Sequence, residues 1–97
     1  MKNYFVYILL CADKTYYTGV TSNLELRLIQ HKSGFYSDSY TYNRRPVKLV
    51  FSEVFRDILQ AIKFEKKIKK WSSHKKEALI KGEYGMLPRL SKKKFNR

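Results

Sequence analysis

The chain has 97 residues, of which 43% are hydrophobic and 15% aromatic, and its 21 Lys+Arg against 8 Asp+Glu give a formal net charge of +13. This composition excludes a largely disordered chain, and the length fits one domain with a modest core. The apolar runs are too short for a transmembrane span or a signal peptide, and the single Cys11 cannot form an internal disulfide. We therefore expect a reduced, cytoplasmic setting, and the surplus positive charge points to nucleic acid or an anionic membrane surface.

The first third of the chain predicts a hairpin followed by a helix. The β-branched and aromatic run 4–11 predicts a strand that is buried on both faces and is therefore central in its sheet. A polar break follows, and the strand pattern resumes over residues 16–20 to complete the hairpin. Asn23 is a good N-cap for a helix with apolar residues at helical spacing, which ends at Ser33 and Gly34.

The middle of the chain predicts a loop and a third strand. Residues 35–45 contain four aromatic side chains without a period, and the Pro46 that follows is unsuited to a central strand. We interpret this segment as a loop of functional character. Residues 47–55 alternate in hydrophobicity and predict the third strand.

Two helices and a tail complete the chain. Asp57 begins a long helix, and Ser72 or Ser73 caps a second one. We therefore expect a single domain over residues 1–82. Residues 83–97 include a run of three lysines and predict a basic, flexible tail that adds salt-sensitive, non-specific affinity if nucleic acid is the partner.

The positive charge is concentrated in the second half of the chain. Residues 49–97 hold 14 basic and 5 acidic side chains, so 14 − 5 gives +9 of the total of +13. Such a block is typical of phosphate binding, and a solvated helix face that keeps the protein soluble is the alternative. The asymmetry favours nucleic acid, and the candidate binding residues are Arg44, Arg45, Lys66, Lys69, Lys70, Lys75 and Lys76.

A carboxylate occupies a core-facing position of the long helix. On a helical wheel Glu65 lies near the middle of the apolar arc, with Lys69 one turn later. One interpretation is an internal Glu65–Lys69 ion pair that satisfies both groups. The other is a carboxylate that projects into a cleft and holds a divalent cation such as Mg²⁺, which takes oxygen ligands and uses only one or two protein carboxylates.

Further candidate site residues lie in the hairpin and in the helix that follows it. Arg27 and His31 are four residues apart and project from one side of the helix, so together they can reach one bound group, with an ordinary surface pair as the alternative. Tyr7 and Tyr17 lie in adjacent strands and share a face if the register permits, with aromatic core packing as the alternative. Gly19 indicates a close approach of backbone or ligand.

Taken together, these residues resemble the GIY-YIG nuclease superfamily, and more closely its small stand-alone bacterial single-domain subgroup (UPF0213-like). The residues that carry the resemblance follow one another in the superfamily's order and spacing: Val6-Tyr7-Ile8, Tyr17-Thr18-Gly19, Arg27, His31 and Glu65. The segments 40–50 and 61–71 also look like that subgroup's pattern, and the match covers about residues 3–81.

The resemblance implies an α/β (α+β) fold with a three-stranded antiparallel sheet flanked by helices. It also implies a metal-dependent endonuclease that hydrolyses phosphodiester bonds of nucleic acid, DNA more than RNA, in repair or processing. Carried over, Glu65 binds Mg²⁺ or Mn²⁺ and Arg27 holds the scissile phosphate. Tyr7 or Tyr17 activates the attacking water, with His31 assisting. A tyrosine base needs its pKa lowered, which a cationic site would do.

Two other functions stay open. An Asn that follows the metal-binding Glu in many nucleases of the superfamily has no counterpart here between Glu65 and Asn96, which favours a non-catalytic nucleic-acid-binding module that keeps the nuclease fold. A basic protein that docks on an acidic partner or membrane would give Tyr7, Arg27 and Glu65 no role beyond stability. Loss of cleavage with retained binding on removal of Glu65 distinguishes an enzyme from a binding module.

Overall fold

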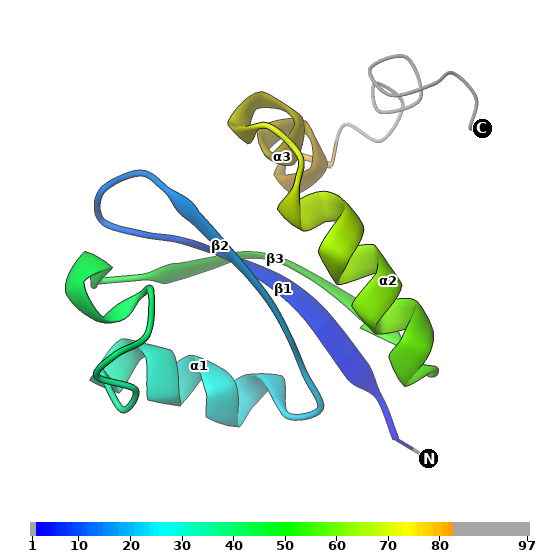
Figure 1. Ribbon diagram of the computed structural model, residues 1–97, viewed down its shortest axis with the longest axis horizontal. Helices are drawn as coiled ribbons and strands as arrows, with labels where there is room; N and C mark the ends of the chain where they lie inside the picture. Colours follow the sequence, from blue (N-terminus) through cyan, green and yellow to red (C-terminus); the bar gives the residue numbers. More distant parts are fainter. Residues whose placement is uncertain (1, 83–97) are drawn as a thin grey trace.

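The structure is a computed structural model that describes residues 2–82, so the predicted tail over 83–97 lies outside the described residues. Three strands form one antiparallel sheet, and helices cover both of its faces (Figure 1). This arrangement confirms the predicted α+β class. The elements are β1 (Tyr4–Leu10), β2 (Tyr16–Thr21), α1 (Leu24–Ser33), the 3₁₀ turn η1 (Tyr42–Arg44), β3 (Lys48–Phe55), α2 (Ile58–Lys69) and α3 (Ser73–Ile80).

Strand β1 occupies the centre of the sheet, whose order is β2-β1-β3. Its four middle residues are all buried, because both faces of a central strand are covered. Alternation along the strand sends Val6 and Ile8 to one face and Tyr7 and Leu9 to the other. The continuous apolar run therefore predicted the central position correctly.

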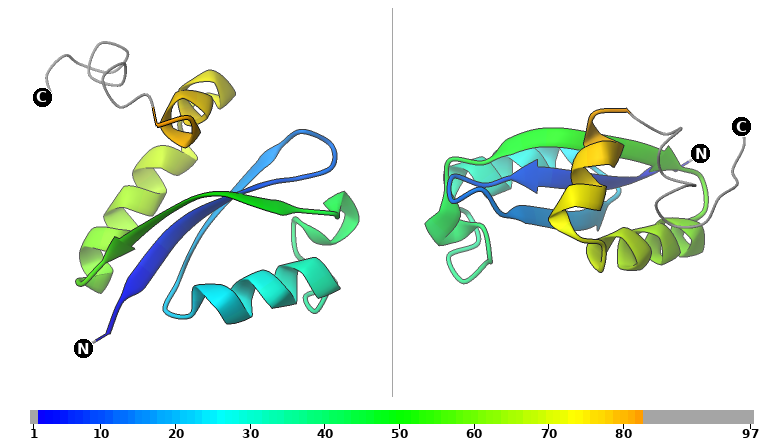
Figure 2. Two further views of the ribbon diagram at one scale, coloured as in Figure 1. Left: turned by 180° about the vertical axis from the view of Figure 1, so that it is seen from behind. Right: turned by 90° about the horizontal axis from the view of Figure 1, so that it is seen from above.

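The two faces of the sheet carry different helices and different cores (Figures 1 and 2). Helix α1 covers the face that bears Tyr7 and Leu9, where its residues Leu24 and Leu28 pack. Helices α2 and α3 cover the opposite face. The core there consists of Val6, Ile8, Phe51, Ala61, Ile68, Ala78 and Leu79. Any side chain of the sheet or of a helix can therefore be assigned to the α1 face or to the α2 face.

The predicted caps define helix α1. The Asn23 side chain accepts a hydrogen bond of 3.1 Å from the backbone N–H of Leu26, which satisfies one of the free donors of the first turn. Gly34 ends the helix in the left-handed conformation at φ 75°, where its N–H reaches the carbonyls of Gln30 and His31. The cap sets the direction in which the chain leaves α1 and enters the segment 35–45, which we call the aromatic loop.

Helices α2 and α3 also begin at capping side chains. Asp57 accepts from the N–H of Leu59 at 3.4 Å, and Ser72, rather than Ser73, caps α3 by accepting from the N–H of Lys75 at 3.2 Å. Ile58, the first residue of α2, is exposed, and the buried stripe of the helix begins at Ala61. None of the helices within residues 2–82 has the length and hydropathy of a membrane span.

Candidate active site

Tyr7 lies at the centre of the candidate site. It projects from β1 onto the α1 face and is 1% exposed, and its partner across the strand pair is Gly19 of β2. A Cβ atom on Gly19 would lie 2.5 Å from the Tyr7 hydroxyl and 2.6 Å from its Cζ. The close approach expected at Gly19 is therefore made by the Tyr7 side chain, which lies across the bare backbone of β2.

His31 connects Tyr7 to the loop after α1. Its Nε2 lies 3.0 Å from the Tyr7 hydroxyl, and its Nδ1 lies 2.9 Å from Oγ1 of Thr41. The Thr41 hydroxyl lies in turn 3.0 Å from Oγ of Ser39. The result is a buried hydrogen-bonded chain from β1 through α1 to the loop, in which both ring nitrogens of His31 have partners.

Thr41 and Ser39 were not among the residues predicted for the site. Both lie in the aperiodic segment 35–45, where the sequence carries no spacing that pairs them with a helix residue. The polar character of the loop between its aromatic residues is the one sequence signal they share. Thr41 is nevertheless among the most buried side chains of the described region.

Arg27 approaches the same hydroxyl from the preceding turn of α1. Its side chain lies close enough to Tyr7 to act on the pKa of that hydroxyl, and its guanidinium carbon lies 6.0 Å from the ring centre of Tyr36. Four residues separate Arg27 from His31, so the two side chains leave α1 on one side as predicted. A neutral imidazole has one donor and one acceptor nitrogen, and we assign the Tyr7 proton to the bond with His31, which makes Nε2 the acceptor and Nδ1–H the donor to Thr41.

The protonation states follow from burial. Desolvation raises the pKa of Tyr7 to about 12, the nearby Tyr17 adds to the rise, and Arg27 offsets part of it. Burial, with a smaller contribution from the Arg27 charge, lowers the pKa of His31 below its ordinary value of 6.5. The expectation that a cationic site lowers the pKa of a tyrosine base is therefore wrong for Tyr7, because burial outweighs the single arginine.

Tyr17 lies on the same face as Tyr7, as the hairpin predicted, but it is only partly buried. Its ring centre is 5.1 Å from that of His31 and 6.3 Å from that of Tyr7. On its other side it stacks with Tyr40 of the loop at 6.0 Å. Because β2 is an edge strand, Tyr17 stands between the buried hydrogen-bonded chain and the edge of the sheet.

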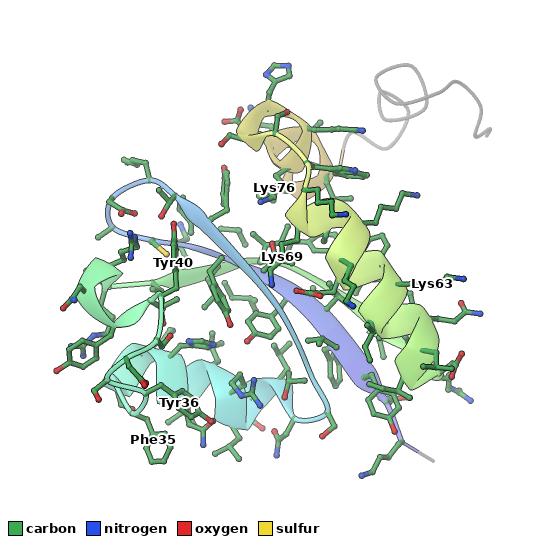
Figure 3. All side chains as sticks on the ribbon, viewed as in Figure 1. Phe35, Tyr36, Tyr40, Lys63, Lys69 and Lys76 are labelled. Carbon is green, nitrogen blue, oxygen red and sulfur yellow. The ribbon has the colours of Figure 1, made fainter. Side chains whose placement is uncertain are left out.

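Glu65 enters from the opposite side of the sheet. It is buried on the α2 stripe between Ala61 and Ile68, as the helical wheel predicted, and its Oε2 lies 3.1 Å from Nζ of Lys69. The internal ion pair, one of the two interpretations of this carboxylate, is thus present. Figure 3 shows Lys69 on the side of α2 that faces β2.

Glu65 and Thr18 bear oxygen atoms on the α2 face, the type of atom that a hard metal ion takes as a ligand. The Thr18 hydroxyl, buried on this face of β2, has no hydrogen-bond partner within residues 2–82. A carboxylate and a hydroxyl fit a hard ion such as Mg²⁺, which keeps several waters and rarely takes a full cage of protein ligands. In the part of the chain that the structure describes, no group of three or more His, Cys, Asp or Glu side chains gathers around one point.

The two predicted nucleic-acid-binding arginines are used within the loop. Arg44 pairs with Asp13 at 2.9 Å, and its guanidinium lies 3.9 Å from the ring centre of Tyr40. Arg45 lies 4.6 Å from the ring centre of Tyr42 and donates from Nε to the carbonyl of that residue. Both arginines thus stabilise the aromatic loop, with their exposed surfaces directed outward.

The predicted lysines of α2 and α3 differ in their surroundings. Lys66 and Lys70 are exposed, and the Lys75 ammonium lies 4.5 Å from the Trp71 ring centre. Desolvation and, to a smaller extent, the charge of Lys69 lower the pKa of Lys76. Lys69 of α2 therefore lies close enough to Lys76 of α3 for its charge to disfavour the protonated form of Lys76.

The fold and this set of side chains define a small α+β domain of the nuclease type. Residues 3–78 match the GIY-YIG catalytic domain, and the chain belongs to the GIY-YIG family. Its relatives include a UPF0213 protein of Syntrophus aciditrophicus, 54% identical over 80 residues that cover 82% of this chain and 91% of the relative. A UPF0213 protein of Desulfotalea psychrophila is 46% identical over 78 residues, which cover 80% of this chain and 71% of the relative.

Two solved structures share the fold. The solution structure of a UPF0213 protein from Bacillus halodurans is 34% identical, with a TM-score of 0.55, and the alignment covers 97% of this chain and 99% of that one. The solution structure of a protein from E. faecalis is 36% identical, with a TM-score of 0.60 over 87% of this chain and 88% of that one. The UPF0213 subgroup inferred from the motifs is thereby confirmed.

Proposed function

We propose that the chain is a divalent-metal-dependent endonuclease that hydrolyses phosphodiester bonds of nucleic acid, preferentially DNA, in repair or processing. The observation that carries this proposal is the convergence of Tyr7, Tyr17, Arg27 and His31, from three elements, on one face of the sheet. A buried tyrosine and a neutral histidine beside an arginine are not needed for packing alone. Apolar residues would fill the same space without the cost of burying polar groups.

In this proposal Arg27 holds the scissile phosphate. Its guanidinium stays charged at any working pH and offers parallel donors to two phosphoryl oxygens. Arg27 is partly exposed, whereas Tyr7 and His31 behind it are buried. Substrate therefore meets Arg27 first, and the buried chain behind it keeps the arginine and the neighbouring Tyr17 in position.

Of the two candidate tyrosine bases, Tyr17 is the better one. A pKa of about 12 disfavours the phenolate of Tyr7, and a side chain 1% exposed has almost no access to water. Tyr17 is partly exposed beside His31 and near the edge of β2. We assign to Tyr17 the orientation or deprotonation of the attacking water and to Tyr7 the positioning of His31 and Arg27.

Glu65 would hold the metal ion, Mg²⁺ or Mn²⁺. The ion, when bound, supplies positive charge that stabilises the developing charge on the phosphoryl oxygens. Helix α2 packs against β2, and β2 is an edge strand, so a phosphodiester would have to lie across that edge to meet both Glu65 and Arg27. The lysines of α2 and α3 would hold the flanking phosphates.

The test is cleavage of supercoiled, linear, single-stranded and branched DNA and of structured RNA with Mg²⁺ or Mn²⁺. We expect Arg27→Ala and Glu65→Gln each to lower the rate about a hundredfold or more, as removal of a charge-stabilising group does in other enzymes. Glu77→Gln and Arg56→Ala, which alter exposed residues of the same types outside the site, are the matched controls. No cleavage by the wild type with either ion on any substrate contradicts the proposal.

A second candidate function is a nucleic-acid-binding module without catalysis. The observation that favours it is the Glu65–Lys69 pair, in which the carboxylate already has a cationic partner. Such a module binds nucleic acid equally well with and without metal, and Glu65→Gln leaves its affinity unchanged or raises it. Binding measured in parallel with cleavage therefore separates the two functions.

A further inference from the structure

Three exposed aromatic side chains surround the candidate site, and the buried network does not use them. We call Phe35 and Tyr36, which contact each other, the aromatic platform. Phe35 is 66% exposed, Tyr36 36% and Tyr40 42%, and all three lie in the loop between α1 and β3. Figure 3 shows Phe35 and Tyr36 along α1 on the side away from α2, whereas Tyr40 lies nearer the β1–β2 hairpin. Exposed aromatic surface of this extent marks a binding site more often than it marks packing.

The rings of the aromatic platform are held in place. Phe35 meets Tyr36 edge to face at 4.9 Å, and the Tyr36 hydroxyl donates to Oε1 of Gln30 at 2.9 Å. Rings fixed in this way lose little conformational entropy when a ligand covers them. Tyr40 is not part of the platform, because the Arg44 guanidinium lies on its ring at 3.9 Å and Tyr17 stacks against it.

The aromatic platform borders the residues proposed to hold the reacting phosphate. The Tyr36 ring centre is 6.0 Å from the Arg27 guanidinium carbon and 6.3 Å from the His31 ring. A nucleotide whose phosphate lies at Arg27 therefore has the Tyr36 ring beside it, and Phe35 lies next to that ring.

We propose that the aromatic platform stacks unpaired bases, so that the site takes single-stranded or locally unpaired nucleic acid in preference to a duplex. Aromatic rings beside a cationic phosphate site recognise a single strand, because every base has a π-face to stack. In a duplex those faces are covered by neighbouring bases, and the rings gain nothing. The net charge of +13 suits a polyanion and not an apolar protein partner.

The proposal rests on the proposed function for the position of the phosphate, and it is tested without metal. In EDTA, we would measure the anisotropy of a short fluorescein-labelled oligothymidylate, of the matching oligouridylate, and of the duplex of each with its complement. We expect Phe35→Ala and Tyr36→Ala each to weaken single-strand binding about five- to a hundredfold. Duplex binding should change less than about twofold, because phosphate contacts are retained.

Matched controls separate stacking from folding and from loss of apolar surface. Leu59→Ala removes a side chain that is 68% exposed at the start of α2, away from the aromatic platform, and should leave all affinities unchanged. Phe35→Trp keeps a stacking ring and should restore single-strand affinity. A strand carrying 2-aminopurine should be quenched by the wild type and by Phe35→Trp, and less by Phe35→Ala, while thermal unfolding verifies that each variant is folded.

The outcomes distinguish this proposal from the one it rests on. Equal losses for single strand and duplex, or no loss in either alanine variant, overturn the aromatic platform even if the wild type cleaves with metal. Selective loss for the single strand supports the platform even if no cleavage is found, which would contradict the endonuclease alone. Comparison of the DNA and RNA strands shows which of the two supplies the unpaired bases.

Discussion

The Tyr7 hydroxyl lies against the backbone of Gly19 in the neighbouring strand, in space that any larger residue at position 19 would need. The pairing of Tyr7 with Gly19 across β1 and β2 puts the two at the same level of the sheet. A Cβ on Gly19 would lie 2.5 Å from the hydroxyl. The hydrogen bond from Tyr7 to His31 therefore depends on a missing side chain in another strand.

Gly19→Ala should destabilise the protein by about 1–3 kcal/mol, the usual cost of overpacking a well-packed region. Because the added methyl displaces the Tyr7 ring, the bond to His31 should lengthen or break. Urea unfolding measures the free energy, and the double variant Tyr7→Leu/Gly19→Ala supplies the control. We expect the double variant to lose less free energy of unfolding than the sum of the losses in the two single variants. Additive losses would show that the ring avoids position 19 by a simple rotation.

Local sequence patterns predicted the helices and strands, and they also predicted part of the candidate site. The apolar run of β1, the caps at Asn23 and Asp57, and the four-residue spacing of Arg27 and His31 act over a few residues, so a single sequence reveals them. The ion pair of Glu65 with Lys69 also spans one helical turn and was among the interpretations considered. Contacts within one turn or one strand pair can be read without knowing the tertiary fold.

The rest of the site depends on contacts between distant segments. Thr41 meets His31 from a loop without a period, and Arg44 pairs with Asp13 in the hairpin turn, which no local spacing signals. The pKa of Tyr7 is raised rather than lowered, because the packing of α1 on the sheet buries its side chain. Burial and long-range pairing are properties of the fold, so charge and residue type alone gave the wrong direction.

Thr41→Val should change the histidine network without changing the shape of the core. The valine leaves Nδ1–H of His31 without its acceptor, which costs about 1–3 kcal/mol in a buried position. Nitrogen-15 NMR of the imidazole should show Nδ1–H in the wild type and a mixture of tautomers in Thr41→Val. Thr41→Ser keeps the hydroxyl and should retain the wild-type spectrum; a wild-type spectrum dominated by Nε2–H would contradict our assignment of the protons.

Stability should fall as the pH drops below about 6.5, and His31 should be a cause. Its pKa is lowered in the folded protein, so below the ordinary value of 6.5 the unfolded chain binds a proton that the folded protein does not. Stability therefore rises with pH through this window and is lost as the pH falls toward the folded pKa. The groups facing His31 are Arg27, which disfavours protonation, and the hydroxyls of Tyr7 and Thr41.

The variant His31→Gln isolates this contribution. Urea unfolding of wild type and variant above and below pH 6.5 gives the change in free energy for each, whatever the variant costs at neutral pH. The decrease in the free energy of unfolding on going to the lower pH should be smaller in His31→Gln than in the wild type. His74→Gln removes an exposed histidine of α3 and should behave as the wild type. Equal decreases in all three proteins would show that other groups produce the pH dependence.

Replacing each tyrosine by phenylalanine should separate positioning from contact with water. Tyr17→Phe removes a partly exposed hydroxyl and should lower the cleavage rate about a hundredfold or more if that hydroxyl takes part in proton transfer. Tyr7→Phe removes the bond to His31 and should cost stability, with a smaller effect on cleavage. Rates at several values of pH, together with thermal unfolding, test this order; a larger rate loss in Tyr7→Phe would reverse the assignment.

If Glu65 holds a metal ion as proposed, Lys69 competes with that ion, and its removal should strengthen metal binding. The ammonium lies 3.1 Å from the carboxylate but is itself well exposed, so the ion pair contributes only about 0–1 kcal/mol to stability. Lys69→Met should therefore fold, with a carboxylate free to take Mg²⁺ or Mn²⁺. If the metal Kd falls tenfold, the metal stabilises the variant by about 1.4 kcal/mol more than the wild type at the same saturating concentration.

Thermal unfolding with increasing Mn²⁺ measures this difference without requiring activity. Lys70→Met, an exposed lysine of the same helix region, should respond as the wild type does. The double variant Glu65→Gln/Lys69→Met should lose the added stabilisation, because the carboxylate that takes the ion is gone. A response of Lys69→Met that equals the wild type, or that persists in the double variant, would place the metal on other residues and would leave Glu65 as the internal partner of Lys69.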